Sequence, residues 1–273
     1  MKLSIITINL NNYNGMKRTI DSVVSQTFTD FEWIVIDGGS TDGSRELIEQ
    51  YQDHFAYWCS EPDKGIYNAM NKGIAHARGE WLQFLNSGDW LVNDKVLNDF
   101  FSESINGDIV YGDFCEVKDD KIQPFYFESE LSFSSLYYEA IAHPSVFIKR
   151  SLLSNRLYKE KYKIIADWEF FLECALNGIC FVHKDILISN YDTTGISSTN
   201  RNLVLQERAD AINRLVPKCI QKDMADIDRK NKIFADGQLL EINTIRNSSR
   251  FLHRLVTLTL YILRFFYKLT VRQ

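Results

Sequence analysis

The sequence lacks any CxxC pattern, and its five cysteines are odd in number and scattered along 273 residues. Free thiols of this kind fit a reducing cytoplasm better than a secreted domain held by disulfides. Residues 1–7 pass directly into a strand-like run and lack the layout of a signal peptide. These absences lead us to expect a cytoplasmic protein.

An excess of positive charge is also missing. The chain has 31 Lys and Arg residues against 36 Asp and Glu residues, and its formal net charge is −5. This balance argues against a general nucleic-acid binder. Hydrophobic residues make up 45% and charged residues 25%, as is usual for a globular protein. The length fits one large α/β domain or two small ones.

Two common nucleotide-binding motifs are absent. No GxGxxG follows the first predicted strand, and GxxxxGK[ST] occurs nowhere in the chain. Dinucleotide-binding and P-loop proteins therefore lose support. The N-terminal part also has no Gly-rich loop bearing Arg and Lys, which makes a sugar nucleotidyltransferase less favoured.

What the sequence does contain is an alternation of strand-like and helix-like segments. Apolar, β-branched or aromatic runs predict strands at residues 3–10, 31–36, 57–59, 81–85, 108–117, 146–148 and 181–191. Helical spacing of apolar residues predicts helices at 16–26, from 44, at 66–77, at 94–104, from 165 and over much of 200–247. We therefore predict an α/β fold with a mostly parallel sheet and right-handed crossovers.

Polar loops follow three of the predicted strands, at residues 9–15, 37–43 and 86–89. The carboxyl ends of parallel strands share one edge, where ligands bind in open α/β sheets. Asp37 fits two roles there, because it can accept hydrogen bonds from a base or ribose or can form a turn before glycines. These loops predict a nucleotide site.

Two further acids have alternative roles. Asp89 can hold a hard cation such as Mg²⁺ or Mn²⁺, which prefer oxygen ligands, or can cap the helix predicted at 94–104. Asp167 opens a predicted helix, where a carboxylate is favoured by the exposed backbone N–H groups whether or not it has a catalytic role.

Taken together, these loops resemble glycosyltransferase family 2. Residues 36–44 read I-D-G-G-S-T-D-G-S, and residues 77–89 read A-R-G-E-W-L-Q-F-L-N-S-G-D. This combination is specific, and the resemblance covers roughly residues 2–190. It implies an inverting, nucleotide-sugar-dependent enzyme of the GT-A fold, with a Rossmann-like sheet flanked by helices and a C-terminal helical extension.

The resemblance also implies roles for individual residues. Asp167 resembles the catalytic base, Asp37 the acid that contacts the nucleobase, and His143 a histidine that faces the donor or the metal. The metal motif of the family, usually Asp-x-Asp-Asp, is here residues 86–89, where only Asp89 is acidic. The implied cofactor is Mn²⁺ or Mg²⁺, to which the donor pyrophosphate adds ligands. The implied donor-binding residues are Thr7, Asn9, Asp37, Asp63, Lys64, Asn86 and Ser87.

The expected reaction moves a sugar from a nucleotide diphosphate sugar, with a UDP-sugar favoured, to a hydroxyl of a lipid-linked glycan. Relatives of this kind build O-antigen, capsule or exopolysaccharide. Two alternatives stay open from the sequence, a sugar nucleotidyltransferase and a catalytically weakened nucleotide-sugar-binding protein. No nucleic-acid partner is expected.

The tail, residues 250–272, has a different pattern. One helical stripe carries its charges and most of its polar side chains, at Arg250, Arg254, Thr257, Tyr261, Arg264, Lys268 and Arg272. Crossing a bilayer would place three cations at depth, at about 2.5–3.5 kcal/mol each near the centre. Lying in the interface avoids that cost, and each cation near anionic headgroups adds about 1 kcal/mol. A helix packed on the catalytic domain or on a second subunit is the alternative.

The expected organisation has three parts. Residues 1–200 form the catalytic domain, with nucleotide-sugar binding in about 1–115 and the acceptor and catalytic base in about 116–200. Residues 201–247 form a helical extension, and 248–273 form a basic amphipathic helix at the membrane interface. This layout predicts a peripheral protein on the inner face of the cell membrane.

Overall fold

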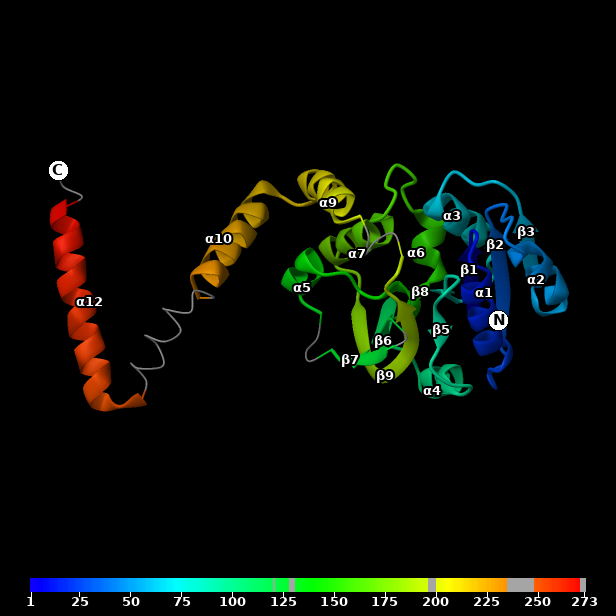
Figure 1. Ribbon diagram of the computed structural model, residues 1–273, viewed down its shortest axis with the longest axis horizontal. Coiled ribbons are helices and arrows are strands. Elements are labelled where there is room, and N and C mark those ends of the chain that lie inside the picture. The colour runs from blue at the N-terminus through cyan, green and yellow to red at the C-terminus, as the bar shows by residue number, and fades with distance from the viewer. Residues whose placement is uncertain (120, 128–130, 196–199, 235–247, 271–273) are drawn as a thin grey trace. The chain divides into compact units, whose positions relative to one another are not determined.

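The structure is a computed structural model, shown in Figure 1. It describes residues 1–119, 121–127, 131–195, 200–234 and 248–270. The chain divides into two compact units, Met1–Leu215 and Val216–Gln273. The whole sheet lies in the first unit.

The first half of this unit consists of parallel strands connected by helices. The strands are β1 (Leu3–Asn9), β2 (Phe31–Asp37), β3 (Tyr57–Ser60) and β4 (Trp81–Phe84), in the order β3-β2-β1-β4. The connections are α1 (Tyr13–Val24), α2 (Ser44–Gln50), the 3-10 helix η1 (Gln52–His54) and α3 (Ile66–His76). The predicted α/β alternation is confirmed, and the carboxyl ends of these strands meet at one edge.

Beyond β4 the sheet becomes mixed. It continues through β8 (Val146–Lys149), β6 (Ile109–Lys118), β9 (Phe181–Asp192) and β5 (Trp90–Leu91), while β7 (Lys121–Phe125) pairs with β6. β8 is antiparallel to both neighbours, whereas β9 is parallel to β6 and antiparallel to β5. The sequence did not predict β5, because two residues are too few to show strand alternation.

The helices of this second half are short except for the last two. They are α4 (Val96–Phe101), α5 (Phe133–Tyr138), the 3-10 helix η2 (His143–Ser145), α6 (Arg150–Asn155), α7 (Ala166–Leu176) and α9 (Arg201–Leu215). Large aromatic residues fill the space around the sheet: Trp33 and Trp81 are 1% exposed, and the rings of Phe100 and Phe147 stack with centroids 3.7 Å apart. This packed core fixes the strand ends that carry the site.

The second unit contains α10 (Lys218–Phe234) and α12 (Arg250–Thr270). The helix predicted for the tail is thus confirmed, although residues 271–273 of the predicted tail and residues 235–247 of the predicted extension lie outside the described residues. Several large apolar side chains of α12 are exposed, Phe251 to 73% and Leu258 to 59%. Within the described part of the chain, none of the helices combines the length and apolarity needed to cross a membrane.

Candidate active site

A cavity of about 730 Å³ lies where the carboxyl ends of β1, β4 and β9 meet the first turn of α7. Seven of the predicted site residues line it, namely Asn9, Asp63, Asn86, Ser87, Asp89, His143 and Asp167. Thr7, Asp37 and Lys64 do not line it. The structure therefore brings together residues that are up to 158 positions apart, from Asn9 to Asp167.

Thr7 and Asp37 are tied to the protein interior. The Thr7 hydroxyl donates to the Leu85 carbonyl at 2.8 Å and accepts from the Trp33 indole N–H at 2.9 Å. The Asp37 carboxylate accepts from Asn9 Nδ2 at 2.8 Å and from the Ser60 hydroxyl at 2.6 Å. It also accepts from the backbone N–H groups of Gly39 and Ser40 and from the Ser40 hydroxyl. The side chain of Lys64 is exposed outside the cavity.

Asp37 shapes the site through its neighbours. Burial raises the pKa of this carboxyl, but hydrogen bonds from Ser40, Ser60 and Asn9 outweigh burial and hold the pKa below its ordinary value. The ionised Asp37 thus organises the turn after β2. It also fixes Asn9, whose Oδ1 is buried at the cavity and has no hydrogen-bond partner among the described residues.

Asp89 lies at the buried floor of the cavity and is 5% exposed. Its pKa is raised to about 8, mainly by burial and also by the nearby charge of Asp192, while the hydrogen bond from the Asp192 N–H and the charge of Arg18 oppose the increase. Asp89 Oδ1 accepts from the backbone N–H of Asp192 at 3.0 Å. Asp192 also lines the cavity and pairs with Arg18 at 3.3 Å. A second carboxylate thus accompanies Asp89.

This pairing depends on β5, because Trp90 and Leu91 pair with Asn190 and Ser189 at the end of β9. The capping alternative for Asp89 is wrong. α4 begins only at Val96, and its preceding N–H, that of Lys95, is bound by the Asn93 side chain at 2.8 Å.

The loop before Asp89 offers oxygen atoms to a ligand. Gly88 has φ 108°, a conformation that residues other than glycine rarely adopt, so an acid at this position of the motif would be strained. Asn86 Oδ1 is buried and has no hydrogen-bond partner among the described residues. Within the described part of the chain, no three His, Cys, Asp or Glu side chains are grouped to hold a metal ion. The side-chain oxygens that line this part of the cavity are those of Asp89, Asp192 and Asn86, of which Asp192 Oδ1 also accepts from the N–H and hydroxyl of Thr194 at 2.9 and 2.7 Å.

Asp167 occupies the first turn of α7, and its side chain is 25% exposed. Its Oδ1 lies 2.7 Å from the Tyr67 hydroxyl and accepts the Trp168 N–H at 2.9 Å. Its Oδ2 lies 3.6 Å from Nδ1 of His143 and accepts no hydrogen bond from the described residues. Hydrogen bonds hold the carboxylate through Oδ1, so Oδ2 is available to a ligand in the cavity.

His143 lies against Asp167 and is packed among aromatic rings. Its Nε2 is 3.0 Å from the Tyr158 hydroxyl, and its ring stacks on Phe84 with centroids 4.7 Å apart. Burial lowers the pKa of His143, and the charge of Asp167 opposes that effect only in part. The imidazole is therefore neutral at pH 7. Its two nitrogens face Asp167 and Tyr158.

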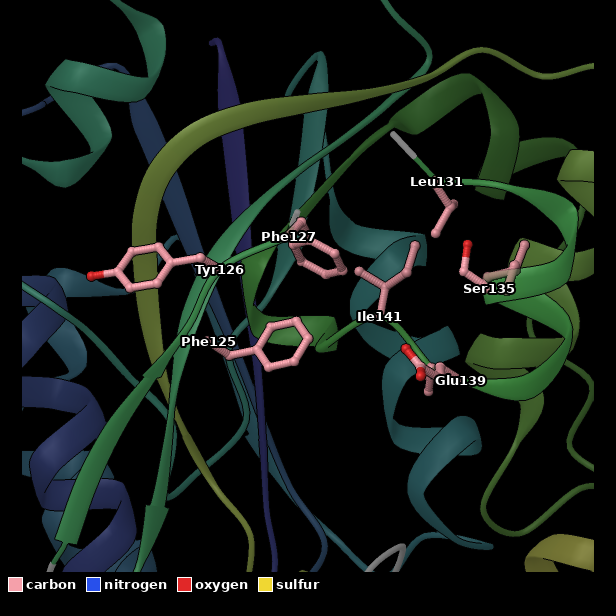
Figure 2. A pocket seen from close by; sticks show the side chains of 9 residues that line it. Phe125, Tyr126, Phe127, Leu131, Ser135, Glu139 and Ile141 are labelled. Atoms are coloured by element: carbon pink, nitrogen blue, oxygen red, sulfur yellow. The ribbon is translucent and has the colours of Figure 1, made fainter. Parts of the chain in front are cut away.

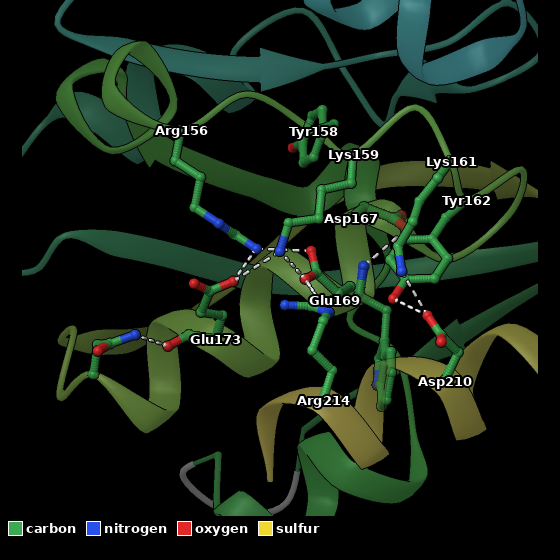
Figure 3. A network of polar contacts seen from close by, with 12 residues as sticks. Arg156, Tyr158, Lys159, Lys161, Tyr162, Asp167, Glu169, Glu173, Asp210 and Arg214 are labelled. Carbon is green, nitrogen blue, oxygen red and sulfur yellow. Dashed lines mark hydrogen bonds and ion pairs between the residues drawn. The ribbon is translucent and has the colours of Figure 1, made fainter.

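A charged network behind α7 fixes the position of Asp167 (Figure 3). Glu169 is fully buried and pairs with Lys159 at 2.7 Å, with Arg156 at 2.7 Å and with Arg214 of α9. Glu173 also pairs with Arg156 and Lys159, at the surface of α7. Glu169 does not line the cavity, so its role is to hold α7 and α9 together.

A second cavity of about 250 Å³ adjoins the first, and both are lined by Ala140 and Ile141. Figure 2 shows the side chains of Phe125, Phe127 and Ile141 directed toward one another, with Tyr126 directed away. Among the described residues that line this second cavity, Tyr126, Ser135 and Glu139 carry the polar side chains. The seven predicted site residues named above line the larger cavity instead.

The sequence did not predict three residues that line the cavity: Tyr67, Asp192 and Arg208. Tyr67 lies on the buried face of α3, where its position in the sequence is typical of an ordinary core residue. Asp192 is 103 residues from Asp89, and its approach depends on the register of β9. Arg208 lies in a polar helix whose sequence has no motif. No local signal identified any of them.

Comparison with known proteins decides the family. The model of Glycosyl transferase family 2 matches residues 4–144. An uncharacterized glycosyltransferase of Mycobacterium tuberculosis is 34% identical over 208 residues, which cover 72% of this chain and 77% of that protein. The chain belongs to glycosyl transferase family 2. A PGL/p-HBAD biosynthesis glycosyltransferase of Mycobacterium bovis is also similar, 29% identical over 201 residues that cover 70% of this chain and 77% of that one.

Solved structures of glycosyltransferases share the GT-A fold of this family 2 enzyme. S. aureus TarS 1–349 in complex with UDP-GlcNAc has a TM-score of 0.65 at 19% identity and covers 90% of this chain and 80% of that one. The mannosyltransferase PcManGT from Pyrobaculum calidifontis, in complex with GDP-Man and Mn²⁺, has a TM-score of 0.58 at 14% identity, with coverage of 96% and 85%. The predicted fold and the predicted transferase activity are both confirmed.

Proposed function

We propose that this family 2 glycosyltransferase is inverting, and that it transfers a sugar from a nucleotide diphosphate sugar to an acceptor hydroxyl at the 730 Å³ cavity. One observation carries the proposal: Asp167 and the Asp89–Asp192 pair line the same cavity. A single displacement needs one carboxylate to receive a proton and a separate place for the leaving diphosphate. A UDP-sugar is the favoured donor.

In this mechanism Asp167 is the base. Its Oδ2 takes the proton of the acceptor hydroxyl while the acceptor oxygen attacks the anomeric carbon. The bond from that carbon to the phosphate oxygen breaks, and its electron pair leaves with the nucleoside diphosphate. The sugar ring acquires oxocarbenium character, as in glycoside hydrolysis. Attack opposite the leaving group inverts the anomeric configuration.

A divalent cation fits the oxygen atoms around Asp89. Asp89, Asp192 and Asn86 would hold Mn²⁺ or Mg²⁺, with the donor diphosphate completing the coordination. Such a cation supplies charge stabilisation for the leaving diphosphate. On the nucleoside side, Asn9, Asp63 and Ser87 line the cavity. Asp37 would contribute by holding Asn9 in place through a hydrogen bond. Thr7 would contribute by its hydrogen bond from β1 to Leu85, which follows β4.

His143 would position Asp167 in this arrangement rather than hold the cation, because its ring nitrogens face Asp167 and Tyr158. Lys64 would reach a donor only by movement of the loop that carries it, since its side chain lies outside the cavity.

The variant Asp167→Asn tests the base. It should bind nucleoside diphosphate with unchanged affinity and lose about 10²–10⁴ in transfer rate, the usual contribution of a general base. Binding is measured by calorimetry and transfer by nucleoside diphosphate release. Asp53→Asn, which changes an exposed acid of η1, is the matched control. Near-normal turnover by Asp167→Asn would show that this carboxylate only stabilises the start of α7.

The acceptor in this proposal is a lipid-linked glycan of O-antigen, capsule or exopolysaccharide synthesis, reached from the inner face of the cell membrane. What supports it is α12, which exposes Phe251, Leu255 and Leu258 and carries a stripe of cations in its sequence. The full-length protein should sediment with anionic liposomes at low salt, and a chain without residues 248–273 should not. No sedimentation of the full-length protein would contradict the membrane role.

A further inference from the structure

The helix α9 presents one face to the loop before α7 and another to the cavity. On the first face, Glu207 accepts from the N–H groups of Lys163 and Ile164, at 2.7 and 3.1 Å. Asp210 and Arg214 pair with Lys161, Tyr162 and Glu169. These contacts fix the helix. Val204 and Arg208, one turn apart, line the cavity on the other face.

The guanidinium of Arg208 is held in place with most of its hydrogen-bonding capacity unused. Its Cζ lies 4.6 Å from the centroid of the Trp168 ring, and its Nη1 donates to the Tyr138 carbonyl at 2.8 Å. Its Nε is buried and has no hydrogen-bond partner among the described residues. A guanidinium has five N–H donors, so several stay available to a ligand.

Arg208 also forms no salt bridge within 4.0 Å among the described residues. Arg208 is the one Lys or Arg side chain among the described residues that line the cavity, against the acids Asp63, Asp89, Glu116, Asp167 and Asp192. Burial lowers the pKa of Arg208, and the charge of Asp167 opposes this only in part. A partly buried cation with free donors favours an anionic ligand.

We propose that Arg208 is the anion-binding residue of the active site and that it binds a phosphate group of a substrate. The inference rests on the proposed function, which places a nucleotide diphosphate sugar and a lipid-linked acceptor in this cavity. The phosphate has two possible sources, the diphosphate of the donor and the diphosphate that links the acceptor glycan to its lipid. Planar N–H pairs of a guanidinium match phosphate oxygens.

The competing role is structural, because Arg208 also joins α5 to α7 through Tyr138 and Trp168. Arg208→Gln removes the charge, and Arg201→Gln removes one from the exposed start of the same helix as a matched control. Calorimetry of each full-length variant with UDP and GDP tests the donor source. Titration with farnesyl diphosphate at saturating nucleotide tests the acceptor source.

A hydrogen bond to a charged group corresponds to about tenfold to hundredfold in affinity. We expect Arg208→Gln to weaken the binding of either the nucleotides or farnesyl diphosphate by that factor. The ligand whose binding is weakened identifies the source of the phosphate. Arg201→Gln should bind both as the unchanged protein does. Arg208→Lys keeps the charge without the planar donors and should recover part of the affinity; it also serves if the Gln variant does not fold.

Unchanged affinity for every ligand in Arg208→Gln and Arg208→Lys would overturn the inference and leave Arg208 as a structural link. The proposed function would survive that result as long as the unchanged protein binds UDP or GDP. Failure of the unchanged protein to bind either nucleotide would instead contradict the proposed function, and the inference with it.

Discussion

The hydroxyl of Tyr67 has a single proton and two acceptor neighbours, Asp167 Oδ1 at 2.7 Å and the Ile164 carbonyl at 2.6 Å. Burial and the Asp167 charge raise the pKa of Tyr67 well above its ordinary value, so this proton stays in place at neutral pH. Tyr67 can donate to the ionised Asp167. Together with the Trp168 N–H, this hydroxyl holds Oδ1 and leaves Oδ2 to receive the proton of the acceptor. The hydroxyl therefore orients the proposed base.

Tyr67→Phe removes this hydroxyl and keeps the ring. The base loses one of the two hydrogen bonds that orient its carboxylate, and misplacement of a catalytic group can cost about 10²-fold, so kcat should fall by about tenfold to hundredfold. The buried Ile164 carbonyl loses a donor as well, which should lower the free energy of unfolding by about 1–3 kcal/mol. The affinity for nucleoside diphosphate should stay unchanged, because these contacts lie at Asp167.

The assay compares Tyr67→Phe with Tyr51→Phe, a change outside the cavity, by nucleoside diphosphate release at saturating donor and by denaturant unfolding. A kcat within twofold of the unchanged enzyme, together with lower stability, would show that Tyr67 supports only the fold. A loss of nucleotide affinity equal to the loss of rate would place its effect on donor binding instead.

Two other predictions concern buried acids. Glu169→Gln should lower the free energy of unfolding by about 3–5 kcal/mol, because Arg156 and Lys159 lose a buried partner. The control Glu173→Gln changes a side chain that is 27% exposed and should cost less than about 1 kcal/mol. Equal losses in the two variants would contradict the structural role of Glu169. Asp89, with a pKa raised to about 8, holds a proton at pH 7 that Mn²⁺ must displace, so Mn²⁺ affinity should rise with pH up to about 8 and level off above it. Calorimetry in buffers of different protonation enthalpy measures the released proton, and a pH-independent affinity would refute the coupling. Without metal, the same raised pKa means that the folded state binds more protons than the unfolded state, so this group lowers stability as the pH rises toward 8.

The parallel half of the fold could be predicted because its signals are local. The strands β1 and β2 are buried along nearly their whole length and appear as continuous apolar runs. The turn after β2 needs Asp37 and glycines, and the sequence shows both. Strand ends in such a sheet converge, so the approach of Asn9, Asn86 and Asp89 followed from topology alone.

The rest of the site could not be predicted because it depends on long-range register. β9 pairs with β6 through two register shifts, between Gly112 and Asp113 and between Asp113 and Phe114. These shifts and the two-residue strand β5 decide that Asp192 lies beside Asp89. A slip of one residue would turn the Asp192 side chain to the other face of the sheet. No sequence pattern within β9 indicates which strand it pairs with or in which register.

The helix α9 shows why the position of a polar helix in the fold is hard to predict from its sequence. Polar and charged residues are interspersed among its seven apolar residues, so the sequence indicates a helical extension that begins at residue 201. In the structure Ala211 is the one fully buried residue of this helix. Its position is set instead by side chains that pair with the loop before α7, and it belongs to the compact unit Met1–Leu215. Hydrogen bonds and ion pairs are the specific part of such an interface, because each needs one partner at one distance. A helix held in this way can place a cation such as Arg208 at the proposed active site although its sequence shows no hydrophobic stripe that would predict the contact.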